Sequence, residues 1–176
     1  MLRRTSALLL LIVVSPVLLL ATVTLFFTSK SGIFFLQERI GKNKKPFIIY
    51  KFTTMHLGEI TAVGKYLRKT GIDELLQLIN IIKGEMSFIG PRPLTSYDIE
   101  RLNWNTNDKI ARWKTLPGIT GMAQLSTVCS ARDSIKNDLY YTKNKSIKLD
   151  TWIFLRSILI PIIGKPKFIP QDERTS

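Results

Sequence analysis

Two adjacent carboxylates, Asp73 and Glu74, are the residues of this sequence best suited to do chemistry. They stand at the expected start of a helix, just after three cations: Lys65, Arg68 and Lys69. Such a group could combine a nucleophile with a ligand for a metal ion. A structural role is the alternative, because Thr70-x-x-Asp73 resembles a capping box and acidic residues in a first turn favour the helix dipole. The local pattern alone favours the cap and leaves the chemical role open.

Two loops could bind anions. Arg92 stands between prolines in Gly90-Pro91-Arg92-Pro93, and a guanidinium held in a stiff loop suits bidentate phosphate binding. The backbone N–H groups of Pro117-Gly118-Ile119-Thr120-Gly121 could line a second anion site. Each loop has an ordinary structural interpretation as a surface or structural turn. Their occurrence in one chain, behind an apolar segment, is what favours a functional interpretation.

The elements that position these residues are predicted to be short, in an α+β fold that is mainly helical. Apolar periodicity that stops before Gly84 indicates one of the helices. In chain order, we expect extended runs at 33–35 and 47–52, a helix or turn at 61–68, helices at 72–83 and 96–115, and a turn at 117–121.

The tail, residues 147–163, is apolar but too charged to span a membrane, since Lys148, Asp150 and Arg156 interrupt it. We expect Pro161 to stop any helix there. Basic residues beside Trp152 suit a helix in the headgroup region of an anionic membrane. A helix packed on the domain core fits the same pattern.

Residues 7–27 carry no charge and are almost entirely apolar, which is about the length needed to cross a bilayer. A cleaved signal peptide is an alternative, but the run is long for one and no small-x-small cleavage site follows it.

Pro16 lies in the middle of this run. Because proline has no N–H, the carbonyl of Ile12 loses its helical partner, and the Ser15 hydroxyl is a plausible replacement donor. The segment is therefore either a kinked single span or a helix-break-helix that enters and leaves through one leaflet. Positive charge on both flanks shows no inside/outside asymmetry of the kind a single span usually has.

The 176 residues have room for one folded domain, and the net charge of +13 favours anionic partners. A single cysteine, Cys129, excludes an internal disulfide, and the single histidine, His56, makes a zinc site unlikely.

Six segments together resemble the bacterial sugar transferase family, the monotopic phosphoglycosyl transferases that begin capsule, exopolysaccharide, O-antigen and glycan assembly. The resemblance covers nearly the whole chain from Arg4 and Ser15-Pro16 onward. The segments are 35–41, 51–55, 64–70, 73–78, 83–93 and 117–124, of which the last two are highly specific.

The resemblance implies a catalytic dyad. Asp73 would be the covalent nucleophile, and Glu74 would position it or help it to hold Mg²⁺. Four basic residues would bind phosphate or substrate: Lys51, Arg68, Arg92 and Arg132. Ser15 and Pro16 would form the break of a re-entrant membrane helix.

The implied reaction moves a sugar 1-phosphate from a UDP-sugar to polyprenyl (undecaprenyl) phosphate and releases UMP. The resemblance implies a re-entrant segment at 1–29, a catalytic domain at 30–170 on the cytoplasmic face of the bacterial inner membrane, and a polar tail at 171–176. Lipid of that membrane, and a second copy of the chain, are the other expected partners.

The sequence departs from the family at several positions: Thr5, Thr53, Leu76 and Thr127-Val128. The last pair replaces a usual Gly-Arg, and Arg132 could supply the missing charge. These departures motivate an alternative, a non-catalytic or divergent membrane partner of a polysaccharide assembly complex. A membrane-tethered nucleic-acid binder has only the net charge in its favour, and we expect no nucleic-acid partner.

Overall fold

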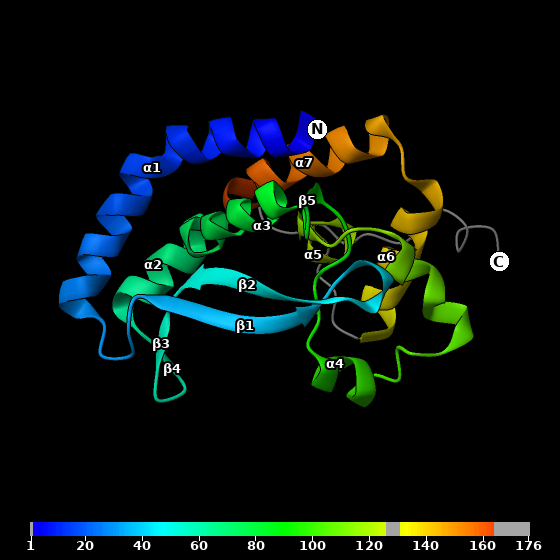
Figure 1. The fold of residues 1–176 in the computed structure, drawn as a ribbon, viewed down its shortest axis with the longest axis horizontal. Coiled ribbons are helices and arrows are strands. Elements are labelled where there is room, and N and C mark those ends of the chain that lie inside the picture. The colour runs from blue at the N-terminus through cyan, green and yellow to red at the C-terminus, as the bar shows by residue number, and fades with distance from the viewer. Residues whose placement is uncertain (1, 126–130, 164–176) are drawn as a thin grey trace. The chain divides into compact units, whose positions relative to one another are not determined.

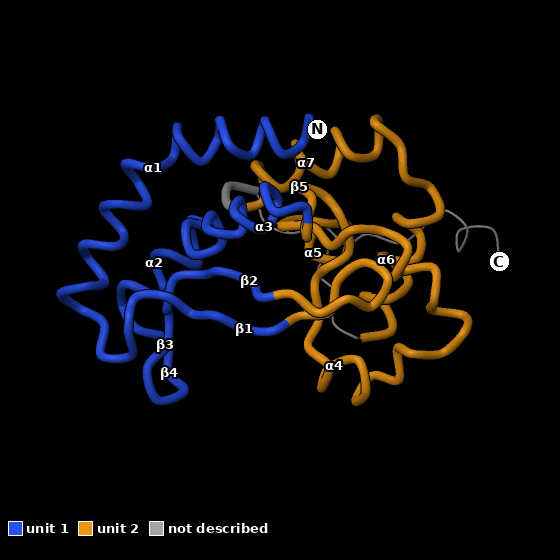
Figure 2. The backbone as a smooth tube through the Cα atoms, viewed as in Figure 1, with its two compact units in different colours: residues 1–38, 48–84 blue, residues 39–47, 85–176 orange. Residues whose placement is uncertain are grey.

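The fold is mainly helical with short strands, as the sequence predicts. The structure is a computed structural model that describes residues 2–125 and 131–163. The chain divides into two units, and Figure 2 colours them separately. The first unit comprises residues 1–38 and 48–84, and the second comprises residues 39–47 and 85–176. The expected polar tail at 171–176 lies outside the described residues.

Helix α1, Leu2–Thr28, begins the first unit and bends near its middle (Figure 1). Pro16 lies inside it, and the Ser15 hydroxyl donates to the Ile12 carbonyl at 2.7 Å. This confirms the predicted replacement donor. The helix continues through Pro16, so the proline bends it without dividing it into two elements. Among the described residues α1 alone has the length and apolar composition to cross a membrane, a property that some core helices and signal sequences share.

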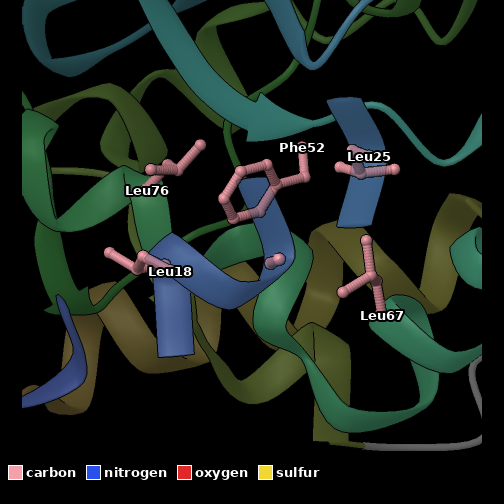
Figure 3. Packing of buried hydrophobic residues seen from close by; sticks show 6 residues of the cluster. Leu18, Leu25, Phe52, Leu67 and Leu76 are labelled. Atoms are coloured by element: carbon pink, nitrogen blue, oxygen red, sulfur yellow. The ribbon is translucent and has the colours of Figure 1, made fainter. Parts of the chain in front are cut away.

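One face of α1 contributes to the core of the first unit. Its buried residues Leu18, Ala21 and Leu25 recur at helical spacing. Figure 3 shows Leu18 and Leu25 packed with side chains from three later elements: Phe52, Leu67 and Leu76. The other faces of α1 expose large apolar side chains, including Leu9, Val13 and Leu20. The helix is therefore anchored along one side, and its remaining surface is suited to lipid.

The predicted extended runs are confirmed as strands. Strand β1, Phe34–Ile40, pairs with β2, Pro46–Phe52, around a 3₁₀ turn η1 at Lys42–Lys44. A short hairpin follows, in which β3, Met55–His56, is antiparallel to β4, Glu59–Ile60.

Helix α2, Ala62–Thr70, begins at Thr61, whose hydroxyl accepts from the Gly64 N–H at 2.9 Å. It ends at Gly71, whose φ of 73° is left-handed. The predicted capping box at Thr70 is wrong, because the Thr70 hydroxyl donates back to the Tyr66 carbonyl at 2.9 Å. The chain then forms the 3₁₀ helix η2, Ile72–Gln77, and α3, Leu78–Lys83. The single helix predicted over 72–83 is thus two elements, and it ends before Gly84 as expected.

The second unit has a parallel pair of strands, β5 at Ser87–Ile89 and β6 at Gly118–Thr120. The turn predicted at 117–121 is wrong in part, because residues 118–120 pair with β5. The helix predicted over 96–115 is divided into α4, Ser96–Arg101, and the 3₁₀ helix η3, Asn107–Lys114.

Helices α5, Met122–Leu125, α6, Ala131–Asn144, and α7, Ile147–Ile163, complete the second unit. The prediction that Pro161 stops the last helix is wrong. The proline lies in the final turn, where its missing N–H removes only one helical hydrogen bond. Ile153 of α7 is fully buried in a cluster with Tyr141 and Ile89, so α7 packs on the core of this unit. Its opposite side exposes Phe154 and Ile158, so the interfacial interpretation stays a prediction.

Candidate active site

The first unit brings together four of the predicted site residues: Lys51, Arg68, Asp73 and Glu74. Lys51, near the end of β2, donates to the Glu74 carboxylate at 2.5 Å. Arg68, in the last turn of α2, donates from Nε to the Thr54 hydroxyl at 2.8 Å. Lys51 and Arg68 also act electrostatically on Asp73. A cation from β2, a cation from α2 and the carboxylates of η2 therefore form one acidic–basic cluster, which we call the dyad cluster.

Two glycines place the members of the dyad cluster. A Cβ on Gly64 would lie 2.1 Å from the Thr54 carbonyl oxygen, so α2 packs against the backbone of the segment after β2. Arg68 follows Gly64 by four residues and lies on the same helix face, which points it at Thr54. Gly71 reverses the chain in a left-handed conformation, and its carbonyl accepts from the Glu74 N–H at 3.2 Å. This fixes the dyad directly after α2.

Asp73 is a buried carboxylic acid that is only 8 % exposed. Burial, and then the neighbouring Glu74 carboxylate, raise the pKa of Asp73 to about 6, while Lys51 and Arg68 act in the opposite direction. In the described part of the chain, neither cation donates a hydrogen bond to it, since Lys51 is bonded to Glu74 and Arg68 to Thr54. A pKa of about 6 leaves Asp73 mostly ionised at pH 7. A carboxylate in that state is a competent nucleophile.

No cluster of three or more His, Cys, Asp or Glu side chains occurs among the residues that the structure describes. Asp73 and Glu74 supply the carboxylate oxygens of the dyad cluster, so a divalent ion bound there would be held by them. Mg²⁺ is commonly held by one or two carboxylates together with substrate phosphates and water. The adjacent oxygen donors fit that ion, and they do not fit zinc, which prefers nitrogen and sulfur ligands.

Arg92 and Arg132 belong to the second unit, and both are exposed. Arg92 lies in the loop between β5 and α4, and Arg132 lies in the first turn of α6. The positions whose departure Arg132 would compensate, Thr127 and Val128, lie outside the described residues.

The glycines around Arg92 have a structural role. A Cβ on Gly118 would lie 2.2 Å from the Gly90 nitrogen, and one on Gly121 would lie 2.0 Å from the Gly90 carbonyl oxygen. The Gly118 N–H donates to the Pro91 carbonyl at 3.0 Å, so that N–H group is not available for an anion. The Pro117–Gly121 segment supports the Arg92 loop, which favours the structural interpretation of this segment.

Sequence reasoning missed one prominent polar contact, between Arg112 and Asp138 in the second unit. The two side chains are almost fully buried, and Arg112 Nε lies 2.8 Å from Asp138 Oδ2. They are 26 residues apart, so no local spacing could reveal the pair. The tryptophan beside Arg112 was the one available signal, because arginine stacks on aromatic rings.

Comparison with known proteins identifies the family. The model of the family described as "Bacterial sugar transferase" matches residues 1–163. An Aeromonas hydrophila UDP-N-acetylgalactosamine-undecaprenyl-phosphate N-acetylgalactosaminephosphotransferase is 35% identical over 164 residues, which cover 82% of this chain and 39% of that protein. A Klebsiella pneumoniae UDP-glucose:undecaprenyl-phosphate glucose-1-phosphate transferase is 34% identical, over 80% of this chain and 35% of its own length.

A shorter relative, an uncharacterized sugar transferase of Bacillus subtilis, is 36% identical over 74% of this chain and 71% of its own length. The chain thus spans well under half the length of the first two relatives and most of the length of the third. The family match extends from α1 through α7 and includes every predicted site residue. The chain belongs to the bacterial sugar transferase family.

Proposed function

We propose that this protein is a phosphoglycosyl transferase that moves a sugar 1-phosphate from a UDP-sugar to polyprenyl phosphate and releases UMP. The observation that carries the proposal is the state of Asp73, a buried carboxylate with a raised pKa whose two neighbouring cations are bonded to Glu74 and Thr54. Two relatives are named for transfer from a UDP-sugar to undecaprenyl phosphate, and these names support the substrate class. They differ in the sugar, so the sugar carried by this chain stays open.

In the first step, an Asp73 carboxylate oxygen attacks the phosphorus that is linked to the sugar. A new acyl phosphate P–O bond forms, the bond to the bridging diphosphate oxygen breaks, and UMP leaves with that oxygen. In the second step, an oxygen of polyprenyl phosphate attacks the same phosphorus. The Asp73–phosphorus bond breaks, the carboxylate is regenerated, and a polyprenyl diphosphate sugar is formed.

The surrounding charges have separable roles in this scheme. Lys51 holds Glu74, which keeps the second carboxylate at a fixed place beside the nucleophile. Lys51 and Arg68 lower the proton affinity of Asp73 and offer positive charge to the phosphate oxygens. Asp73 and Glu74 would hold Mg²⁺, which when bound neutralises charge on the diphosphate. Arg92 and Arg132 are proposed as further phosphate-binding residues on the family resemblance.

We also propose that α1 is re-entrant, so that both of its ends face the cytoplasm at the bacterial inner membrane. The bend at Pro16, the lipid-suited outer faces of α1 and the basic residues on both flanks support this topology. It would hold residues 30–170 as a catalytic domain at the headgroup plane, where the carrier phosphate lies.

Cysteine labelling tests the topology. Single cysteines at positions 2 and 30, in a Cys129→Ser background, should both resist a membrane-impermeant maleimide in spheroplasts and both react in inverted vesicles. Labelling of only one of them in spheroplasts would place the two ends on opposite sides and contradict the re-entrant helix.

Release of UMP tests the reaction. The full chain in detergent or nanodiscs should release UMP from a UDP-sugar when Mg²⁺ and undecaprenyl phosphate are present. Asp73→Asn should lower the rate by at least about 10³-fold, since it removes the nucleophile. Asp108→Asn, an exposed acid in the second unit, is the matched control and should keep the wild-type rate. Equal rates for Asp73→Asn and wild type would contradict the proposed mechanism.

A further inference from the structure

The loop that carries Arg92 is held by its backbone carbonyls, while the Arg92 side chain is exposed. Four consecutive carbonyls, from Pro91 to Leu94, each accept a hydrogen bond from another residue of the second unit, and the last two donors are neighbours in β1. The pairs are Pro91 with the Gly118 N–H at 3.0 Å, Arg92 with Arg112 Nη2, Pro93 with Arg39 Nη1 at 3.3 Å, and Leu94 with the Ile40 N–H at 2.8 Å. Two of these donors are guanidinium groups, those of Arg39 and Arg112.

The guanidinium of Arg112 is itself fixed from several sides. Its Nε donates to Asp138, which is 1% exposed, and its charged carbon lies 5.3 Å from the ring centroid of Trp104 and 4.8 Å from that of Trp113. A planar guanidinium enclosed by a carboxylate and two aromatic faces has little freedom to reorient. The Nη2 donor that remains is directed at the Arg92 carbonyl.

Arg39, the other guanidinium donor, lies near a carboxylate that is partly exposed. Its partner Asp98 lies 3.8 Å away, and the Asp98 side chain is 29% exposed. Asp98 also contacts the exposed Arg101 and the Thr95 hydroxyl. Of the two side-chain clamps on the loop, the Arg112 contact is the one whose carboxylate partner is buried.

We infer that Arg112 and Asp138 are positioning residues that act through Arg92, by holding the loop backbone so that the Arg92 guanidinium is oriented toward a substrate phosphate. A buried ion pair is not needed to keep a fold, because apolar residues of similar size often replace one without loss of stability. What an apolar pair cannot supply is a donor for the Arg92 carbonyl. The inference rests on the proposed function, in which Arg92 binds phosphate.

Binding of UDP with Mg²⁺ to the full chain is the test, because UDP carries the diphosphate but no sugar to transfer. The double variant Arg112→Met/Asp138→Leu removes the clamp and fills its volume with apolar atoms. We expect it to keep its thermal unfolding midpoint within a few degrees and to bind UDP on the order of tenfold more weakly. Asp138→Asn can still accept from Arg112 Nε, so it should retain most of the affinity.

A double-mutant cycle, in which the clamp variant is combined with Arg92→Ala, separates positioning of Arg92 from a general structural effect. If the pair acts through Arg92, removing it in the Arg92→Ala background should not weaken UDP binding further. Ile153→Ala damages the hydrophobic cluster around Tyr141 and not the one that contains Trp104 and Trp113, so it is the control, and any loss of binding it causes should be equal in both backgrounds. If the double variant does not fold, Arg112→Lys serves in the same cycle, because lysine keeps a cation beside Asp138 but lacks the planar fork that also reaches the Arg92 carbonyl.

Two results would overturn the inference: an equal loss of affinity from removing the pair with and without Arg92, or no effect of Arg92→Ala on UDP binding. The proposed function fails separately, by an absence of UMP release from the wild-type protein that still binds UDP. If the wild-type enzyme releases UMP but the effects of the clamp variant and Arg92→Ala on UDP binding simply add, the positioning role is wrong and the proposed function stands.

Discussion

Each unit of the molecule buries a carboxylate near arginine or lysine, but only the carboxylate of the second unit is bonded to its cation. In the second unit Asp138 is bonded to Arg112 at 2.8 Å within a tryptophan-lined pocket. In the first unit Asp73 is also buried, yet its cations are bonded elsewhere, to Glu74 and Thr54. Asp138 is satisfied by its bonded arginine, whereas a buried carboxylate with a raised pKa and no bonded cation is a candidate for chemistry.

Breaking the Arg112–Asp138 contact and breaking the Lys51–Glu74 contact should therefore affect stability and activity differently. Asp138→Leu alone leaves Arg112 buried and unpaired, and we expect it to lower the free energy of unfolding by about 3–5 kcal/mol. Lys51→Met breaks a partly exposed pair and should lower it by about 1 kcal/mol or less, while UMP release falls strongly. Denaturant unfolding of both variants measures the difference. Equal destabilisation by the two variants would remove the distinction.

Asp73→Asn should make the protein more stable while it abolishes activity. Because its pKa is raised, ionising Asp73 in the folded state costs about 1–3 kcal/mol at pH 8, the lower figure allowing for screening by solvent. This cost is absent below pH 3.8, grows as the pH rises toward 6, and is complete above it. The increase in unfolding free energy caused by Asp73→Asn should grow over the same pH range. Asp108→Asn, which replaces an exposed carboxylate, should cause no such increase. A destabilised Asp73→Asn protein at pH 8 would contradict the raised pKa of Asp73.

The rate of the first step should fall as the pH drops through about 6, because protonation removes the nucleophile. Glu74→Gln removes a charge that raises the pKa of Asp73, so the acidic limb of its profile should move to lower pH. Arg68→Gln removes a charge that lowers this pKa, so its limb should move to higher pH. Profiles of single-turnover UMP release measure the shifts, and movement in the same direction for both variants would show that the limb belongs to another group.

Local rules predicted a good part of this fold. The strands near 33–35 and 47–52, the helix after Thr61 and the hydrogen bond from Ser15 to the Ile12 carbonyl all follow from residue type and short spacing. The errors arose where a residue is compatible with more than one local structure. Thr70 donates back into α2 and does not cap the next helix, and Pro161 falls in a final turn where its cost is small.

The site residues also divide into those that the sequence could predict and those that it could not. Asp73, Glu74, Lys51 and Arg68 come from three elements within 24 residues, and the family resemblance placed them together. Asp138 could not be assigned to Arg112, because their contact depends on how α6 and η3 pack in the second unit. Long-range burial of this kind has no short-range signature in one sequence. The membrane topology, the Mg²⁺ site and the roles of Arg92 and Arg132 stay predictions.

The most direct measurement is the mass of the enzyme after reaction with a UDP-sugar in the absence of polyprenyl phosphate. UDP-glucose, UDP-galactose and UDP-N-acetylgalactosamine are suitable probes, because relatives are named for these sugars. With the accepted donor, the peptide containing Asp73 should gain the mass of one sugar phosphate, and undecaprenyl phosphate should remove it. UMP release that requires the carrier and leaves no adduct on this peptide would contradict the account.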